Sequence, residues 1–223
     1  MKNSFLVLVA SLFLFTGCLK SDFEIQKRVE VLFLVDNLNT DLFFGEDTLR
    51  IEEFKYAVNS FSLITEDSTE LRTGSDINAL IFGYDASASG DRIVISTGLG
   101  FELNGFVSYE LSLAPVEDGA TILDPDFFGG DNNYSIIIEG SVNGESFTYR
   151  SDIDFIKKYF FDPIFVTDTN ETIFLRSRID MEKVFVDAED NFLNPRGTTN
   201  TVAINEKIRE ELNAEAFLGT IFF

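Results

Sequence analysis

The side chains that carry most enzyme and metal chemistry are unevenly represented in this sequence of 223 residues. It has no histidine and one cysteine, but 38 aspartate and glutamate residues against 17 lysine and arginine residues, for a net charge of −21. Histidine is the commonest general base and the commonest ligand of transition metals. Its absence excludes a Ser-His-Asp or Cys-His site and disfavours zinc and copper, which leaves carboxylate chemistry.

Two acidic loops are the candidate ligand sites. In one of them Asp187, Glu189 and Asn191 fall at alternate positions, as the early ligands of a calcium loop do. Phe192 and Thr198 stand where that loop needs a glycine and a bidentate glutamate, so a true EF-hand is excluded. An irregular calcium site and a plainly solvated acidic loop remain as alternatives, and no other cofactor is expected.

The other acidic loop combines carboxylates with aromatic rings in a glycine-rich stretch. Its candidate residues are Asp124, Asp126, Phe127, Phe128 and Asp131. The carboxylates could bind calcium, and exposed rings could bind a ligand at the end of a sandwich. The alternative is that the rings fold back and close that end. Paired carboxylates could also serve a glycoside hydrolase, but no pair stands out among so many acids, so no catalytic residue is assigned.

The first residues have the layout of a secretory signal. Lys2 supplies a positive start, and residues 5–15 form an apolar run that is too short for a membrane span. The small residues Thr16 and Gly17 close the run directly before Cys18, the only cysteine of the chain. The alternative is an ordinary signal peptide in which this cysteine stands by chance.

This arrangement resembles the bacterial lipoprotein signal, the lipobox, with Phe15 in place of the usual leucine. The resemblance implies that residues 1–17 are a signal peptide, that a lipid is attached to the Cys18 sulfur, and that the new amino terminus is acylated, for example with palmitate. Two or more acyl chains make such an attachment stable. Residues 18–28 would form the lipidated tether. We therefore expect a protein of the bacterial cell envelope, anchored to the outer membrane at its surface or its periplasmic face.

Alternating apolar runs predict a series of strands. Residues 29–35 read as a central strand, because apolar side chains lie on both of its faces. Further strands are expected over residues 47–54, 56–65, 79–84, 92–97 and 173–180, and residues 153–161 are ambiguous between a strand and a short helix.

Two Asn-Gly pairs predict β-hairpins. Asn104-Gly105 connects residues 101–103 with 106–113, and Asn143-Gly144 connects residues 134–142 with 145–150. Both central residues of a type I′ turn need positive φ, which asparagine and glycine tolerate.

One late stretch has the period of a helix. Ile204, Ile208 and Leu212 recur every four residues and Phe217 follows, which predicts an amphipathic helix of about fifteen residues packed on a sheet. With about nine strands before it, the pattern indicates a mainly β fold, an antiparallel β-sandwich with one C-terminal amphipathic helix. No linker divides residues 29–223, so we expect a single domain.

Three stretches carry a resemblance to known proteins: the strand over 56–64, the aromatic loop over 124–130 with the strand after it, and residues 192–195 before the helix. They are similar to β-sandwich domains of uncharacterised bacterial lipoproteins and, more faintly, to copper-binding lipoproteins associated with methanobactin uptake. The resemblance implies a sandwich in a surface lipoprotein. This chain lacks the histidines and tryptophans on which such copper sites depend, so copper binding is not carried over.

Together these features predict a lipid-anchored, extracytoplasmic, non-catalytic protein that binds or supports another macromolecule. The expected partners are the membrane, through the lipid on Cys18, and an envelope protein or glycan. The negative charge repels nucleic-acid phosphates, so nucleic-acid binding is not expected. The alternatives are a calcium- or glycan-binding surface module that acts through the sandwich loops, and a carboxylate-dependent glycoside hydrolase.

Overall fold

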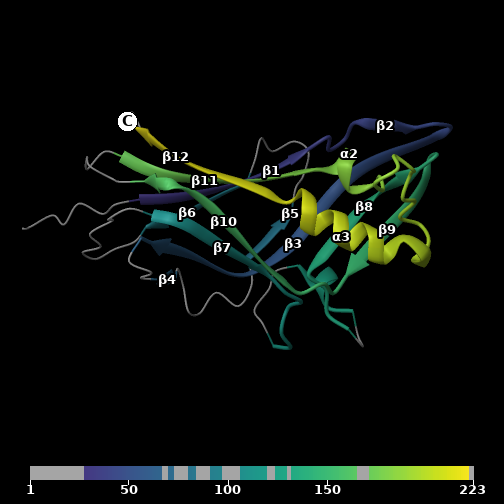
Figure 1. The fold of residues 1–223 in the computed structure, drawn as a ribbon. Helices are drawn as coiled ribbons and strands as arrows, with labels where there is room; N and C mark the ends of the chain where they lie inside the picture. Colours follow the sequence, from purple (N-terminus) through teal and green to yellow (C-terminus); the bar gives the residue numbers. More distant parts are fainter. Residues whose placement is uncertain are drawn as a thin grey trace, which may run out of the picture.

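A computed structural model describes residues 28–66, 70–72, 80–83, 91–96, 106–119, 124–129, 132–164 and 171–220. Within these ranges the molecule is mainly β, with a four-stranded and an eight-stranded sheet facing each other and one longer helix beside them (Figure 1). The predicted β-sandwich with a late helix is confirmed. No helix in these ranges is long and apolar enough to cross a membrane.

The four-stranded sheet, which we call sheet A, contains the strand predicted to be central. Its order is β12-β11-β1-β6, with bounds Asn213–Thr220, Glu171–Asp180, Arg28–Asp36 and Asp91–Ser96. β1 lies between β11 and β6, which confirms the central position. β1 and β11 run parallel, from Arg28 beside Thr172 to Asp36 beside Asp180, whereas the other pairs are antiparallel. Sheet A is therefore mixed, and the chain builds all the described strands of the other sheet between β1 and β11.

The eight-stranded sheet, sheet B, is organised around β3 (Asp47–Thr65). The order of its main path is β10-β7-β3-β8-β9, with bounds Phe155–Ile164, Phe106–Leu113, Asp47–Thr65, Ile136–Val142 and Glu145–Ser151. Three shorter strands also pair with β3, namely β2 (Asp41–Phe44), β4 (Glu70–Arg72) and β5 (Leu80–Gly83).

The prediction of two strands, over residues 47–54 and 56–65, was wrong, because β3 continues through both. The register of β3 shifts opposite β8 between Ile51 and Glu53, so the strand bends there without ending. Gly140 faces this point, where a Cβ atom would come within 2.1 Å of the Arg50 carbonyl oxygen. The close approach of the two backbones therefore needs a residue without a side chain.

The second Asn-Gly hairpin is confirmed. Asn143 and Gly144 have φ of 52° and 79° between β8 and β9, as a type I′ turn requires. In the first predicted hairpin, β7 is present but Asn104-Gly105 and residues 101–103 lie outside the described residues. The ambiguous stretch at 153–161 forms strand β10.

The helix is shorter than predicted. α2 (Met181–Val184) follows β11, the short 3₁₀ turn η2 (Thr198–Asn200) precedes α3, and α3 spans Thr201–Glu211. Ile204 and Ile208 of α3 are buried in the core that the two sheets share. Leu212 caps the helix and Phe217 lies in β12, so its assignment to the helix was wrong. Pairing of β12 with β11 outweighs the local helical period.

Candidate functional site

The aromatic loop closes one part of the molecule instead of exposing its rings. It forms the 3₁₀ turn η1 (Pro125–Phe127), and Phe127 is fully buried against Val116 and Ile137. Phe128 is partly buried on the same cluster. Asp131 lies outside the described residues. The two phenylalanine rings therefore fold back onto the sheet, as the alternative to a ring-lined binding site predicted.

The acidic residues of this loop surround a buried lysine that sequence reasoning missed. The Nζ atom of Lys55, on β3, lies 2.9 Å from Asp124, 3.0 Å from Asp126 and 3.2 Å from Glu53. Only 9% of the Lys55 side chain is exposed. Burial alone would lower the Lys55 pKa, but the three carboxylates outweigh it and raise the pKa above its ordinary value. Asp124 and Asp126 thus hold η1 against the sheet.

The other acidic loop uses its first carboxylate to fix its own backbone. Asp187 Oδ1 accepts hydrogen bonds from the Glu189 and Asn191 backbone N–H groups at 3.0 and 2.8 Å. The Asn191 side chain also donates to Asp187, and these bonds hold the Asp187 pKa below its ordinary value. In the described part of the chain, no three His, Cys, Asp or Glu residues are grouped to hold a metal. Cys18 lies outside the described residues.

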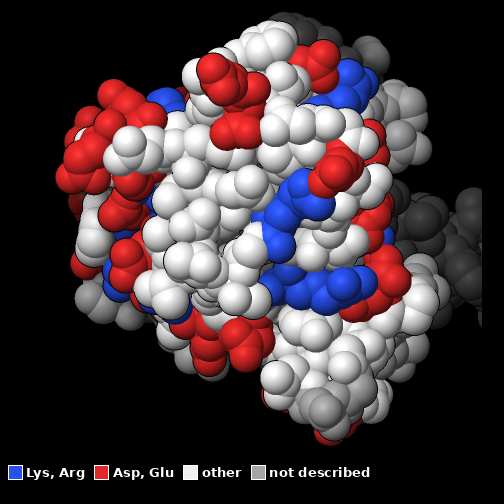
Figure 2. Space-filling model, turned by 90° about the vertical axis from the view of Figure 1, so that its right-hand side faces the viewer, with Lys and Arg blue, Asp and Glu red and all other residues white. Residues whose placement is uncertain are grey.

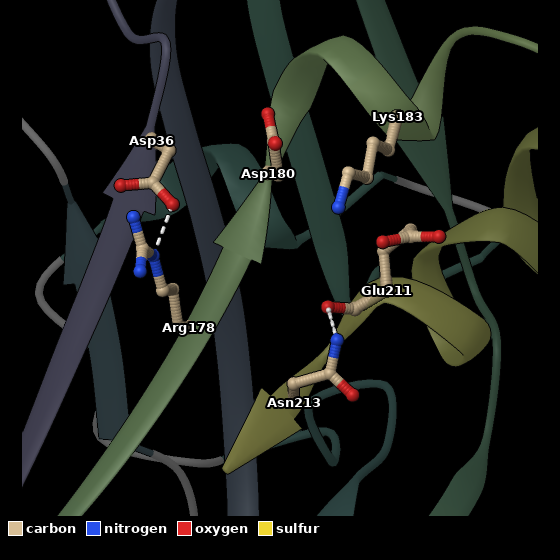
Figure 3. Close-up of a pocket in the computed structure, with 6 residues that line it drawn as sticks. All are labelled: Asp36, Arg178, Asp180, Lys183, Glu211 and Asn213. Carbon is tan, nitrogen blue, oxygen red and sulfur yellow. Dashed lines mark hydrogen bonds and ion pairs between the residues drawn. The ribbon is translucent and has the colours of Figure 1, made fainter.

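A polar groove at one end of sheet A is the candidate functional site (Figure 3). We call it the sheet A groove. It has a volume of about 300 Å³, and its lining residues come from five elements: Asp36 of β1, Arg178 and Asp180 of β11, Lys183 of α2, Glu211 of α3 and Asn213 of β12. These elements meet because β1 and β11 end side by side.

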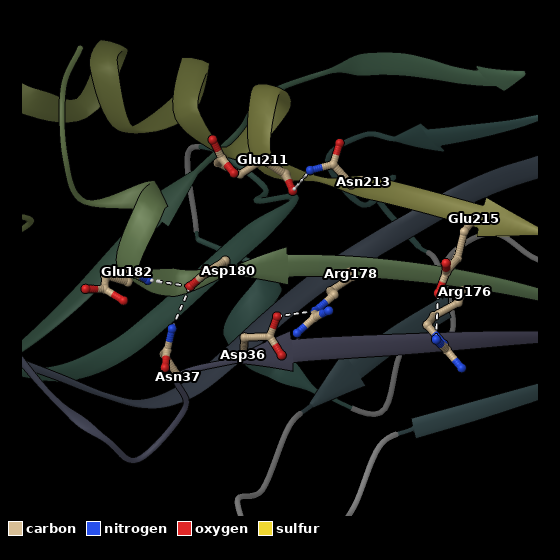
Figure 4. A network of polar contacts seen from close by, with 9 residues as sticks. All are labelled: Asp36, Asn37, Arg176, Arg178, Asp180, Glu182, Glu211, Asn213 and Glu215. Atoms are coloured by element: carbon tan, nitrogen blue, oxygen red, sulfur yellow. Dashed lines mark hydrogen bonds and ion pairs between the residues drawn. The ribbon is translucent and has the colours of Figure 1, made fainter.

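Several lining groups are held in place by contacts with each other (Figure 4). The Arg178 Nε group is ion-paired with Asp36. Asp180 Oδ1 accepts hydrogen bonds from Asn37 Nδ2 at 2.7 Å and from the Glu182 backbone N–H at 3.1 Å. The second of these bonds caps α2. The walls of the groove are thereby fixed before anything binds.

Other lining groups make no such contact. Among the described residues, the Lys183 ammonium, the Glu211 carboxylate and Asp180 Oδ2 have no hydrogen-bond or ion-pair partner in the structure. In Figure 3 the Lys183 side chain extends into the space between Asp180 and Glu211. The groove thus presents both positive and negative groups that are free of direct ion pairs and hydrogen bonds with the described residues.

A second hollow of about 240 Å³ adjoins the groove and shares Arg178 and Asn213 with it. Arg176 and Glu215 also line it, and these two side chains are ion-paired at 2.6 Å. Figure 2 shows a different face, the right-hand end of the molecule in Figure 1, where acidic side chains stand in groups around a mainly uncharged area that contains basic side chains. The two hollows form a polar trough with alternating charges on the outer face of sheet A.

Sequence reasoning missed this groove because its residues are far apart in the chain. Asp36 and Asp180 each end a strand, which is the one local signal that could have drawn attention to them. That signal has meaning only when the two strands are known to be parallel neighbours, because side chains then meet at one edge. The parallel pairing is a tertiary feature.

Comparison with known proteins finds one distant likeness among the solved structures. No family model and no curated protein matches the chain. MbnP from Methylosinus trichosporium is similar over 79% of this chain and 87% of its own, with 10% sequence identity and a TM-score of 0.46. A likeness this distant says nothing about a ligand, an activity or an anchor of this chain.

Proposed function

We propose that the protein is a lipid-anchored, non-catalytic binding protein of the bacterial envelope, which holds a polar partner in the sheet A groove. The observation that carries this proposal is the groove itself. Its walls are fixed by internal hydrogen bonds, while Lys183, Glu211 and one oxygen of Asp180 face the space unpaired. Asp180 is held in place while one of its oxygens has no partner, which favours binding, because little conformational freedom is lost when a ligand pairs with it.

The non-catalytic part of the proposal is supported by what the perturbed groups do. Arg178, which lines the groove, has its pKa raised by its pair with Asp36 and stays charged, so it offers no general base. Burial raises the pKa of three tyrosines, and each hydroxyl takes part in a structural hydrogen bond: Tyr109 with Ser177, Tyr149 with Asn205, and Tyr159 with the Leu212 carbonyl oxygen. Lys55 is likewise committed to its three carboxylates. Catalytic groups usually have shifted pKa values in a cleft, whereas these stabilise the fold.

The anchor is supported by the lipobox at Cys18, and the direction of β1 decides where the groove would stand relative to the tether. A tether of ten residues from Cys18 reaches at most about 35 Å. β1 then leads away from Arg28 to Asp36 over about 26 Å, at roughly 3.3 Å per residue. The groove would therefore stand at the far end of β1 from the tether, where a partner outside the bilayer can reach it.

Membrane fractionation of Cys18→Ala tests the anchor. We expect the variant to lose lipid labelling and to leave the membrane fraction, because the thioether-linked lipid has no attachment point. Ser21→Ala, in the same tether, should remain in the membrane fraction. Unchanged fractionation of Cys18→Ala would contradict the anchor.

Affinity capture tests the binding role. Intact protein in native membranes should retain an envelope partner or ligand that the double variant Lys183→Met and Glu211→Gln does not retain. Glu210→Gln is a matched control, because Glu210 precedes Glu211 but is ion-paired with Lys207 outside the groove. Identical recovery with all three proteins would contradict a role for the groove.

A further inference from the structure

The unpaired groups of the sheet A groove specify the chemistry of its ligand. We propose that the groove binds a basic amino acid, a small molecule that carries two ammonium groups and one carboxylate, and this proposal rests on the binding function proposed above. Two groove carboxylates, Asp180 and Glu211, would receive the ammonium groups. Lys183 would pair with the ligand carboxylate.

The position of Glu211 favours a cation at this end of the groove. It is the last residue of α3, where a carboxylate is unfavourable because the C-terminal end of a helix carries partial negative charge. Lys157, whose Nζ atom donates to the Arg209 and Glu210 carbonyl oxygens, offsets part of this cost electrostatically, but the Glu211 carboxylate makes no hydrogen bond or ion pair with the described residues. An ammonium group bound there would pair with the carboxylate and also interact favourably with the helix dipole.

Asp180 offers a second acceptor whose direction is already fixed. Asn37 Nδ2 and the Glu182 N–H group both donate to Oδ1, so Oδ2 is the oxygen that remains without a partner. The carboxylate cannot turn freely without giving up one of these bonds. It is therefore preorganised to accept from a ligand.

The opposite charge is available in the same space. The Lys183 ammonium makes no ion pair with the described residues. Arg178 is held by Asp36 through Nε, which leaves its terminal N–H groups as further donors. A ligand carboxylate can pair with these donors. A ligand that lacks a carboxylate would leave the Lys183 ammonium without a partner.

Size and charge balance select among ligands. The lining carries three carboxylates and two cations, and the Asp36–Arg178 pair neutralises one of each. Two carboxylates and one ammonium remain, which is the complement of lysine. A volume of about 300 Å³ is at the lower end for small-molecule sites and suits a ligand of about ten non-hydrogen atoms.

Isothermal titration of the full mature protein, purified from membranes in detergent, tests this inference with L-lysine as the probe. Cadaverine, which lacks the carboxylate, and L-glutamate, which has the opposite charge balance, are the comparison ligands. We expect L-lysine to bind at least about tenfold more tightly than either, since each charge-assisted hydrogen bond contributes about that factor. Absence of L-lysine binding, or equally tight binding of cadaverine, would overturn the inference.

Two variants and two matched controls locate the site. Glu211→Gln and Lys183→Met should each weaken L-lysine binding about tenfold or more. Glu210→Gln and Lys207→Met should bind like the wild type, because these residues pair with each other outside the groove. Circular dichroism checks that each variant is folded. Equal affinities for all four variants would overturn the site, and the comparison of ligands on the wild type tests the ligand class independently of any variant.

This result can be separated from the anchor. Membrane fractionation of Cys18→Ala tests the lipid and does not depend on L-lysine. The titration tests the ligand, and the same protein can be taken from the soluble fraction if it carries no lipid. Failure of the ligand inference with intact membrane attachment and partner capture would leave the proposed binding function in place.

Discussion

At the scale of single residues, Lys55 is the side chain that most clearly links packing to charge. It lies in the middle of β3, and its ammonium group pairs with Glu53 of the same strand, with Asp124, which caps η1, and with Asp126 of η1. A buried charge is stable only when it is paired, so the lysine and the loop depend on each other. The consequence is that the loop carrying Phe127 is held on the sheet by charge as well as by apolar contact.

Substitution of Lys55 by methionine should therefore destabilise the protein. Lys55→Met retains the apolar stem but leaves three carboxylates close together, and we expect the free energy of unfolding to fall by about 2–3 kcal/mol. This is less than for a fully buried pair, since 43% of the Asp126 side chain is exposed. Urea denaturation measures the change. Lys158→Met, which breaks the more exposed pair with Glu110, should cost less than about 1 kcal/mol. Equal losses would contradict this account.

The same cluster predicts a dependence on acid. Burial acts to raise the Asp124 pKa, but hydrogen bonds from the Asp126 N–H group and Lys55 hold it below the ordinary value of 3.8. A carboxyl group with a lower pKa in the folded state stabilises that state above its unfolded pKa, and the contribution is lost as pH falls through the folded value. The wild type should thus have a larger free energy of unfolding than Asp124→Asn at pH 6. The difference between the two proteins should shrink below about pH 4. Urea denaturation across pH measures it. A constant difference would contradict the shift.

At the scale of elements, a buried hydrogen bond joins the two sheets. Tyr109 of β7, in sheet B, is hydrogen-bonded to Ser177 of β11, in sheet A, and both side chains are at most 1% exposed. The Tyr109 ring stacks on Tyr159, with ring centroids 4.9 Å apart. Tyr159 in turn donates to the Leu212 carbonyl oxygen, between α3 and β12. These contacts fix β10, β11 and the start of β12 relative to each other, and hence the groove formed there.

A double-mutant cycle tests the bond between the sheets. Tyr109→Phe should lower the free energy of unfolding by about 1–3 kcal/mol, because the Ser177 hydroxyl is left buried without a partner. Adding Ser177→Ala should recover about 1 kcal/mol of that loss, since no polar group then remains unpaired. Urea denaturation of the four proteins gives the coupling energy. Additive losses would show that the two hydroxyls are not coupled.

At the scale of the whole molecule, excess negative charge is the dominant property. With a net charge of −21, the acidic side chains repel each other in the folded state. Individual ion pairs on the surface offset little of this repulsion, since each contributes only about 0–1 kcal/mol. Exposed lysine and arginine side chains reduce this repulsion. Those of the groove lie within a predominantly acidic molecule, which discourages anionic partners at a distance and favours cationic ones.

Salt should therefore stabilise the protein. Raising sodium chloride from about 0.01 M to 0.15 M shortens the screening length from about 30 Å to 8 Å, and we expect the melting temperature to rise as repulsion weakens. Differential scanning fluorimetry measures the shift. Choline chloride should act equally, because screening does not depend on the identity of the cation. A fall in melting temperature would contradict dominant repulsion, and a larger rise with calcium chloride at matched ionic strength would indicate a calcium site.

Local features of this chain were readable from its sequence because their causes are local. The β8–β9 hairpin follows from the positive φ that Asn143 and Gly144 tolerate, and the start of α3 follows from the spacing of Ile204 and Ile208. Phe217 marks the limit of such reasoning. It continues the helical period approximately, yet lies in a strand because β11 offers its backbone a partner.

The sequence by itself determined a β-rich sandwich, one late helix, an acidic body without imidazole chemistry and the arrangement of residues around Cys18. The tertiary structure alone decided which charges meet. Lys55 reaches Asp124 and Asp126 across the fold, and the parallel pairing of β1 with β11 places Asp36 beside Asp180. The physical reason is that hydrophobic period and turn chemistry act over a few residues, whereas a site made of charges depends on contacts between residues that are distant in the chain.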